Sequence, residues 1–596
     1  MKSFNLIKPY LIEKRLSLLL GLVCLIAVDL LNLSLPRVIK WAIDDLTTFS
    51  ADTKGLFIYA LYITGLAAMI GITRAGWLRC FIGMAVRLEE GLRNHLFSHI
   101  QTLSASYFNK TKTGDLMAHA TNDIQHVRFA VGMGIVMLID SIFMTVASVG
   151  FMLYINVQLT VLVFIPMPFI VFAAWFFSRK MHQLYQDVQA AFSELTEVVR
   201  ERFAGIRIIK AYNGEAKALS DLEKMSQHYV DKNIGLVKIT GFFSPLMTFF
   251  SSLSVAIVLC FGGRLAILST ITPGDFVAFI TYLGLLSWPM TAMGRVINMV
   301  QRGKASLDRL DKIVQTHSEM DDAADAKPVT QFRERIVFKN VSFSYDTNAE
   351  DADSHETDAE ASERPPALSD ISIELAQGKT LGIIGPPGSG KTSLLNLIPR
   401  FFEVSQGQIL MDGTNIRKLR LRDLRSLISF MPQEPFLFAG TIGQNITFGD
   451  ENISESELIR AAKDAALYDA IQAFPKGFDT VVGEKGVVLS GGQKQRVALA
   501  RSLIRETPIL ILDDPISQVD TETGSIIVDT LRAMKGRRTL MIVSHRLSAV
   551  RFADQIITLR QGEIEELGSP EQLMARDGYY AQTLRIQKLE EELHAS

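Results

Sequence analysis

Residues 380–393 read TLGIIGPPGSGKTS, an apolar strand, a glycine-rich turn and the start of a helix. This order fits the P-loop pattern, in which glycines let backbone N–H groups wrap phosphates. Lys391 supplies a cation for the terminal phosphates, Thr392 a hydroxyl for Mg²⁺, and the helix start adds a favourable dipole. The stretch predicts a nucleotide-binding α/β domain whose contacts are Gly385, Pro386, Pro387, Gly388, Ser389, Gly390, Lys391, Thr392 and Ser393.

A second apolar strand, residues 509–512, leads into Asp513. P-loop domains need a Mg²⁺-organising carboxylate at the carboxyl end of such a strand. Between the two strands lies a glycine-containing pentapeptide that opens a helical run, so its backbone amides are again presented at a helix start. Its residues are Leu489, Ser490, Gly491, Gly492 and Gln493. From about residue 336, short apolar strands alternate with helices, which predicts a parallel sheet.

The residues before about 298 are of a different kind, because their apolar side chains gather in long runs. Six runs approach or exceed the ~20 residues that cross a bilayer, at 16–35, 55–72, 131–155, 159–177, 244–261 and 276–296. The first lacks a small-residue cleavage site and is expected to be a retained span. Basic residues precede it and acidic residues follow it, which places the N-terminus in the cytoplasm. An even number of spans returns the chain there.

The connections between these runs alternate in length. The outer ones, 156–158 and 262–275, are short, whereas the inner ones, 79–128 and 179–238, are long and carry apolar residues at helical spacing. We therefore expect the spans to continue into the cytoplasm as helices. The long hairpins are expected to turn at polar segments, within 113–123 and at 213–215. These tips could contact a cytoplasmic motor or be solvated turns.

Composition excludes some classes of function. The net charge of −2 gives no sign of attraction to nucleic acid. The three cysteines, Cys24, Cys80 and Cys260, are widely spaced in or beside apolar runs, which argues against a disulfide framework or a metal cluster.

The P-loop, the pentapeptide at 489–493 and Asp513 are similar, in order and spacing, to the Walker A, signature and Walker B motifs of ABC ATPases. With six spans ahead of them, the whole chain resembles an ABC exporter half-transporter. The resemblance implies a multi-domain fold, an all-α six-helix transmembrane domain followed by an α/β P-loop ABC ATPase domain. The implied layout is an elbow helix at 1–15, a transmembrane domain at 16–300, a linker at 301–335, a nucleotide-binding domain at 336–570 and a helical tail at 571–596.

The same resemblance assigns further residues. Tyr345 matches the aromatic that stacks on adenine, and His545 matches the switch histidine. Gln433 matches the Q-loop glutamine, which would join Thr392 and Asp513 around Mg²⁺. The remaining assignments are Ser517 and Asp520 in the D-loop, the loop 482–486 that contacts the second hairpin of the opposite subunit, and the coupling residues Asp115, Gly214 and Glu215. ATP and Mg²⁺ are the implied cofactors.

One residue departs from the family. After the Walker B aspartate the family usually has a glutamate that acts as general base, whereas this sequence has Asp514, which is one methylene shorter. A base must come within about 2.6–3.2 Å of its proton or act through a water, so we expect slow hydrolysis at this site. The D-loop, 515–520, also departs from the usual sequence, while His545 is retained.

In the family, two ATPase domains enclose two nucleotides head to tail, so the signature at 489–493 serves the partner's ATP. The preferred reading is one subunit of an asymmetric heterodimer that exports drug-like molecules or lipids across the cytoplasmic membrane by alternating access, with its ATPase domain in the cytoplasm. A slow homodimer, a lipid flippase, a peptide exporter and an ATP-gated pore or regulatory subunit remain alternatives, because fold does not fix the cargo.

Two features stay open at the level of sequence. Asp29 and Asp140 lie inside apolar runs, where a carboxyl group lines a transport path or is satisfied by neighbouring helices or by Arg74. Residues 346–364 are acidic and lack apolar periodicity, which predicts a disordered insertion with a regulatory role or none.

Overall fold

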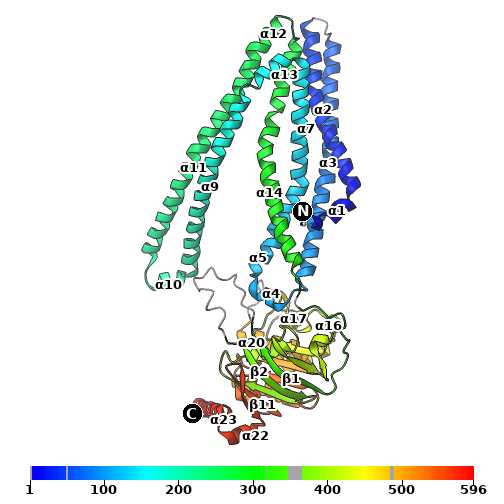
Figure 1. Cartoon of the computed structure of the whole chain (residues 1–596). Coiled ribbons are helices and arrows are strands. Elements are labelled where there is room, and N and C mark those ends of the chain that lie inside the picture. Colours follow the sequence, from blue (N-terminus) through cyan, green and yellow to red (C-terminus); the bar gives the residue numbers. More distant parts are fainter. Residues whose placement is uncertain (1–2, 49–51, 319, 346–364, 484–488, 596) are drawn as a thin grey trace. The chain divides into compact units, whose positions relative to one another are not determined.

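The computed structural model describes residues 3–48, 52–318, 320–345, 365–483 and 489–595 (Figure 1). The predicted acidic insertion, 346–364, and most of the loop 482–486 lie outside these residues. The chain divides into two compact units. The first comprises Met1–Ser98 and Met117–Gln315, and the second comprises His99–Leu116 and Thr316–Ser596.

The first unit is helical. Its long helices are α2 (Arg15–Thr47), α3 (Thr53–Ile100), α7 (Ile135–Ile155), α9 (Met167–Ala204), α11 (Glu215–Ile257) and α14 (Ser287–Gln315). Its shorter helices are α1 (Lys8–Glu13), α6 (Ile124–Phe129), α8 (Val157–Val163), α10 (Ile206–Ala211), α12 (Gly263–Ile267) and α13 (Pro273–Leu285). Helices α9 and α11 run side by side and are joined by α10 (Figure 1).

Five helical stretches among the described residues are long and apolar enough to cross a membrane, at 15–47, 53–100, 113–155, 157–204 and 215–267. They cover the first five predicted spans. The sixth predicted span, 276–296, is covered by two helices, because α13 has 13 residues and ends before Leu286, and α14 begins at Ser287. A crossing there has to combine both helices.

The inner connections are helical as expected, but the first turn differs from the prediction. Helix α3 ends at Ile100, the short helix α4 (Ala105–Lys110) follows, and α5 (Thr113–Ala118) starts where the turn was expected. Asp123 lies within a helical stretch, where Arg309 and His119 bind its buried carboxylate. Asp123 is therefore a buried carboxylate paired within the helical domain rather than part of a turn.

The second hairpin turns where the sequence indicated. Asn213 has a φ of 51°, in the left-handed region that asparagine tolerates. Gly214 is the N-cap residue of α11, and Glu215 is the first residue of that helix.

The second unit contains two sheets. Its six-stranded sheet has the order β12-β11-β3-β10-β9-β6, parallel except for β12. Its strands are β3 (Thr380–Ile384), β6 (Ile428–Met431), β9 (Ile509–Asp513), β10 (Thr539–Val543), β11 (Gln555–Arg560) and β12 (Glu563–Gly568). Every residue of β3, β9 and β10 is buried, which explains their unbroken apolar sequence.

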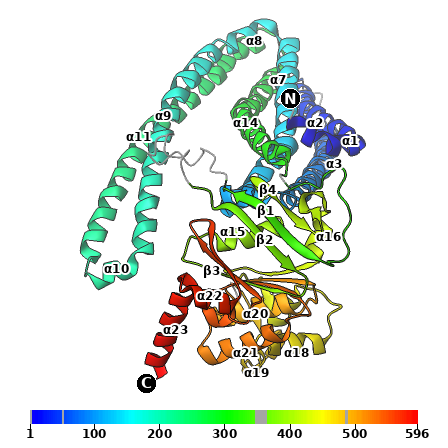
Figure 2. The same ribbon diagram turned by 60° about the horizontal axis from the view of Figure 1, so that its bottom comes forward.

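The other sheet is antiparallel and has the order β2-β1-β4-β5, with β1 (Arg335–Phe343), β2 (Leu368–Ala376), β4 (Gln406–Met411) and β5 (Thr414–Asn415). A short pair joins β7 (Gly440–Thr441) to β8 (Val481–Val482). In Figure 2, β1, β2 and β4 lie on one side of this unit and helices α18 to α21 on the other. The helices are α15 (Lys391–Leu397), α16 (Leu421–Ser426), α17 (Ile442–Thr447), α18 (Glu455–Asp464), α19 (Tyr468–Gln472), α20 (Gly491–Leu503), α21 (Thr521–Ala533), α22 (Pro570–Arg576) and α23 (Tyr579–Ala595).

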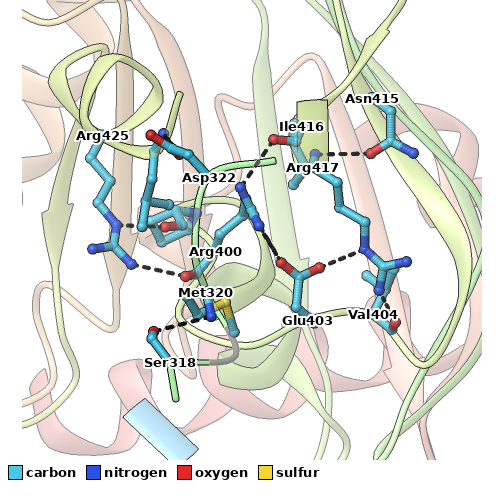
Figure 3. Close-up of polar contacts among 12 residues, drawn as sticks. Ser318, Met320, Asp322, Arg400, Glu403, Val404, Asn415, Ile416, Arg417 and Arg425 are labelled. Carbon is cyan, nitrogen blue, oxygen red and sulfur yellow. Dashed lines mark hydrogen bonds and ion pairs between the residues drawn. The ribbon is translucent and has the colours of Figure 1, made fainter. Parts of the chain in front are cut away.

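The structure divides the predicted linker, 301–335. Its first part continues α14 to Gln315, and the rest belongs to the second unit. There Met320 is buried, and Asp322 accepts a hydrogen bond of 2.7 Å from the backbone N–H of Leu421 (Figure 3). Figure 3 also shows Glu403 bound by two arginines, the buried Arg400 and, at 2.6 Å, Arg417. The segment after α14 is thus fixed to the second unit by polar and apolar contacts.

Candidate functional site

The loop between β3 and α15 has the backbone that the P-loop pattern predicts. Gly385, Gly388 and Gly390 have φ values of 152°, 76° and 95°. At Gly390, the N-cap residue of α15, a Cβ would lie 2.5 Å from the carbonyl oxygen of Ala367. Only glycine combines this backbone conformation with this close approach.

Lys391 begins α15 and extends back over the loop. Its Nζ donates to the carbonyl oxygens of Gly385 at 3.0 Å and Pro386 at 2.8 Å. The side chain is buried, and burial lowers the pKa of the Lys391 ammonium, although Asp513 opposes the shift. The lysine charge is therefore held against the glycine-rich backbone that would cradle phosphates.

Asp513 ends β9 and is 1% exposed. Its Oδ2 has no hydrogen-bond partner among the described residues. Burial raises the pKa of the Asp513 carboxyl, and a hydrogen bond from Thr392 opposes the shift. Because buried polar atoms normally have a partner, an acceptor left open beside a threonine hydroxyl fits a cation ligand.

Asp514 has a left-handed backbone, with a φ of 55°. Its N–H donates to the Val543 carbonyl oxygen at 2.8 Å, and its own carbonyl oxygen accepts from the Gln495 amide at 2.7 Å. Ser544 Oγ donates to the carboxylate Oδ1 at 3.2 Å, and the residue is 4% exposed. The carboxyl group expected to act as base is therefore buried and bonded to a neighbouring strand end.

The signature residues begin α20. Ser490 is the N-cap, and its side chain and backbone exchange hydrogen bonds with Gln493 at 3.2 and 3.0 Å. A Cβ on either Gly491 or Gly492 would come within 2.4 Å of an oxygen of Gln518. These glycines allow the D-loop to lie directly against the signature.

The other predicted D-loop residues have local partners. Gln495 donates to Ser517 Oγ at 2.8 Å, and its own Oε1 accepts from the Gln518 N–H at 2.9 Å. Asp520 caps α21 by accepting from the Thr523 N–H at 2.9 Å. The signature, D-loop and Walker B segments thus form one hydrogen-bonded assembly around Gln495.

The residues matched to the adenine-stacking aromatic, the Q-loop glutamine and the switch histidine are all exposed. Tyr345 is 42% exposed, and its hydroxyl is 2.9 Å from Ser393 Oγ on the P-loop helix. Its ring meets that of Phe343 edge-on at 4.7 Å. Gln433 follows β6 and His545 follows β10, and both are exposed.

The structure brings part of the predicted site together. Five of its residues lie at the carboxyl ends of β3, β9 and β10, where they are close enough to interact electrostatically. They are Lys391, Thr392, Asp513, Asp514 and His545. This edge of a parallel sheet is where nucleotides bind. The predicted coupling residues lie elsewhere: Asp115 is exposed in α5, and Gly214 and Glu215 begin α11.

Two side chains that bind Asp514 were not predicted from the sequence. Gln495 is fully buried and Ser544 is 1% exposed, and both bind Asp514. Gln495 lies two residues after the signature and Ser544 lies directly before His545, and these positions were the available signals.

The comparisons with known proteins agree with this geometry. Residues 18–290 match the family model described as the ABC transporter transmembrane region, and residues 368–517 match the model described as ABC transporter. The chain belongs to the ABC transporter family. Its ATPase domain binds ATP, and hydrolysis there is coupled to transport through a multi-pass membrane domain.

Several relatives match this ABC transporter over nearly its whole length. "Probable multidrug resistance ABC transporter ATP-binding/permease protein YheI" of Bacillus subtilis (strain 168) is 35% identical over 575 residues, 96% of this chain and 95% of YheI. "ATP-dependent lipid A-core flippase" of Syntrophus aciditrophicus (strain SB) is 34% identical over 580 residues, which cover 96% of this chain and 92% of the flippase. The solved structure of a bacterial Atm1-family ABC exporter with ATP bound aligns with a TM-score of 0.76 at 26% identity, covering 96% of this chain and 98% of that one. The predicted exporter fold and ATPase activity are confirmed.

Within the membrane domain, the buried carboxyl group of Asp29 neighbours the half-buried Asp140. Asp29 is 1% exposed, and Asp140 accepts a hydrogen bond from Trp288 Nε1 at 3.2 Å. Asp29 Oδ2 has no hydrogen-bond partner in the described part of the chain, and no ion pair joins Asp29 to Arg74 there. The protein surroundings thus satisfy Asp140 in part and leave one oxygen of Asp29 open.

Proposed function

We propose that this transporter exports hydrophobic or amphipathic compounds, drug-like molecules or lipids, from the cytoplasmic side of the cytoplasmic membrane. Its N-terminus and ATPase domain lie in the cytoplasm, and alternating access is driven by ATP binding and hydrolysis. The names of its relatives support this cargo class, since they include multidrug resistance proteins and a lipid A-core flippase.

We further propose that the chain is one half of a heterodimer in which its own ATP site is the slow one. One observation carries this proposal. The residue in the place of the general base, Asp514, is short and 4% exposed, and Ser544 occupies its Oδ1. A buried carboxylate that is one methylene shorter than glutamate and bonded to a neighbouring strand end is held back from the attacking water, which lowers the rate. A slow homodimer is the alternative.

The residues of this chain would have separate roles at that site. The P-loop backbone and Lys391 bind the phosphates, Tyr345 stacks on the base, His545 orients the terminal phosphate, and Asp514 receives the proton of the attacking water. Thr392, Gln433 and Asp513 would hold Mg²⁺, and the open Asp513 oxygen supports that assignment. When bound, Mg²⁺ neutralises phosphate charge. Ser490 and the glycines after it complete the site of the second half.

Exposed apolar surfaces support assembly with a second half. The tip helix α10 and the residue after it expose Ile208 and Tyr212, at 66% and 83%. In the second unit, Phe436, Phe438 and Phe448 are at least half exposed and lie with ring centres 5.0 and 5.5 Å apart. Clustered exposed aromatics mark protein contacts. In the proposed dimer, the tip of one half docks on the ATPase domain of the other.

Transport into inside-out membrane vesicles tests the export proposal. We expect a fluorescent amphipathic compound or lipid to accumulate against its gradient with ATP, but not with a non-hydrolysable analogue. Flux that only dissipates a gradient and opens equally with the analogue would contradict export and favour the ATP-gated pore.

A further inference from the structure

The C-terminal helix α23 is docked on the core of the ATPase domain. Tyr580 and Ala581 are 1% and 0% exposed, and Leu584 is 8% exposed within the same apolar cluster as Leu547. The N–H of Tyr580 also donates to Glu566 at 3.0 Å. One face of α23 is therefore fixed against the domain.

Gln587 lies on that face, three residues beyond Leu584. Its side-chain amide makes two hydrogen bonds to the loop that carries the switch histidine. Nε2 donates to the carbonyl oxygen of His545 at 2.7 Å, and Oε1 accepts from the N–H of Leu547 at 2.9 Å. The amide thus bridges backbone groups on both sides of Arg546, beyond the end of β10.

Two other contacts hold the same loop. The N–H of Arg546 donates to Ser544 Oγ at 3.0 Å, and Arg546 Nη1 donates to the Val519 carbonyl oxygen in the D-loop at 3.0 Å. Ser544 in turn donates to Asp514. The histidine loop is therefore anchored by Asp514, the D-loop and α23, and Gln587 is the hydrogen-bonding link to α23 that binds the backbone of His545 itself.

We propose that Gln587 is a positioning residue for His545. An exposed histidine side chain can be aimed only as well as its backbone is fixed, and the neutral amide of Gln587 supplies a donor and an acceptor to that backbone together. The C-terminal helix then belongs to the catalytic apparatus, because displacing α23 removes the anchor that binds the His545 backbone.

Gln587→Met tests this in the full-length assembled transporter, because methionine has similar length but makes neither hydrogen bond. We measure this chain's ATP site as the turnover left after Ser490→Arg disables the second half's site. There we expect kcat to fall about tenfold, as two ordinary hydrogen bonds allow, with KM for ATP within about twofold. The adjacent exposed Lys588→Met is the matched control and should leave both unchanged. A rise in KM for ATP with kcat unchanged would overturn the proposal. So would equal effects of Gln587→Met and Lys588→Met.

Two further measurements exclude a merely structural role. If Gln587 acts through His545, Gln587→Met should cause no additional loss in a His545→Ala background, whereas a full additional loss would contradict this. Amide hydrogen exchange across residues 544–549 should rise in Gln587→Met and not in Lys588→Met, with the unfolding midpoint retained. This exchange does not depend on which ATP site carries the flux, so unchanged exchange overturns the proposal by itself.

Discussion

Among single residues, Lys391 has the clearest chemical assignment. It is 6% exposed, and the loop that it contacts supplies only carbonyl and hydroxyl acceptors. Burial lowers the pKa of Lys391, while the carboxylates of Asp513 and Asp514 favour its charged form. A buried cation without a carboxylate in direct contact is suited to an anionic ligand.

Lys391→Ala removes this charge, and hydrogen bonds to charged groups contribute about 1.5–3 kcal/mol each. We expect ATP affinity at this chain's site to fall at least about tenfold, with the helical content of the membrane domain unchanged. Titration with a fluorescent ATP analogue and circular dichroism would measure both. The exposed Lys418→Ala is the control, and unchanged affinity in Lys391→Ala would refute the P-loop assignment.

At the scale of elements, one carboxylate ties the strand before the P-loop to its neighbours. Asp554 accepts from the Thr380 N–H at 3.0 Å and pairs with Lys379 and Lys535, each at 3.2 Å. Burial alone would raise the pKa of Asp554, but these hydrogen bonds lower it below the ordinary value. The interactions favour the ionised form in the folded state.

Asp554→Asn should therefore lower the unfolding midpoint of the full-length protein at neutral pH. Since the folded-state pKa is depressed, the contribution is complete above the unfolded-state pKa of about 3.9 and is lost as pH falls through the folded value. The difference between the two proteins should shrink below about pH 4. Asp577→Asn, which removes an exposed pair with Arg585, is the control. A difference that persists unchanged at low pH would contradict the linkage.

Elements with a local sequence signal were predictable. The P-loop strand and turn, the Walker B strand and the second hairpin turn lie where the sequence indicated, because glycine, asparagine and apolar periodicity act locally. The first hairpin turn was misplaced. Its polar residue Asp123 is satisfied by Arg309, 186 residues away, and a local pattern cannot distinguish such a partner from solvent.

At the scale of the whole molecule, motif order identified the family and its two domains. The links between motifs were not predictable. Gln495 joins the signature helix to Asp514, and Gln587 joins the C-terminal helix to His545, across 19 and 42 residues. Neither has a spacing pattern, because each contact depends on how separate elements pack.

We propose that the two ATP sites of the assembled exporter are unequal, with Ser490 serving the ATP site of the second half and Asp514 serving this chain's own site. If the second half has the complete catalytic base, loss of Ser490 removes the γ-phosphate contact from the site that carries the flux, and loss of Asp514 affects only the slow site.

ATP turnover of the assembled transporter carrying Ser490→Arg or Asp514→Ala tests whether the two sites are unequal. We expect Ser490→Arg to abolish most turnover, Asp514→Ala to retain most of it, and this chain purified alone to hydrolyse ATP poorly. If Asp514→Ala removes activity as fully as Ser490→Arg, or if the chain alone is a fast ATPase, the two sites are equivalent and the transporter is a homodimer.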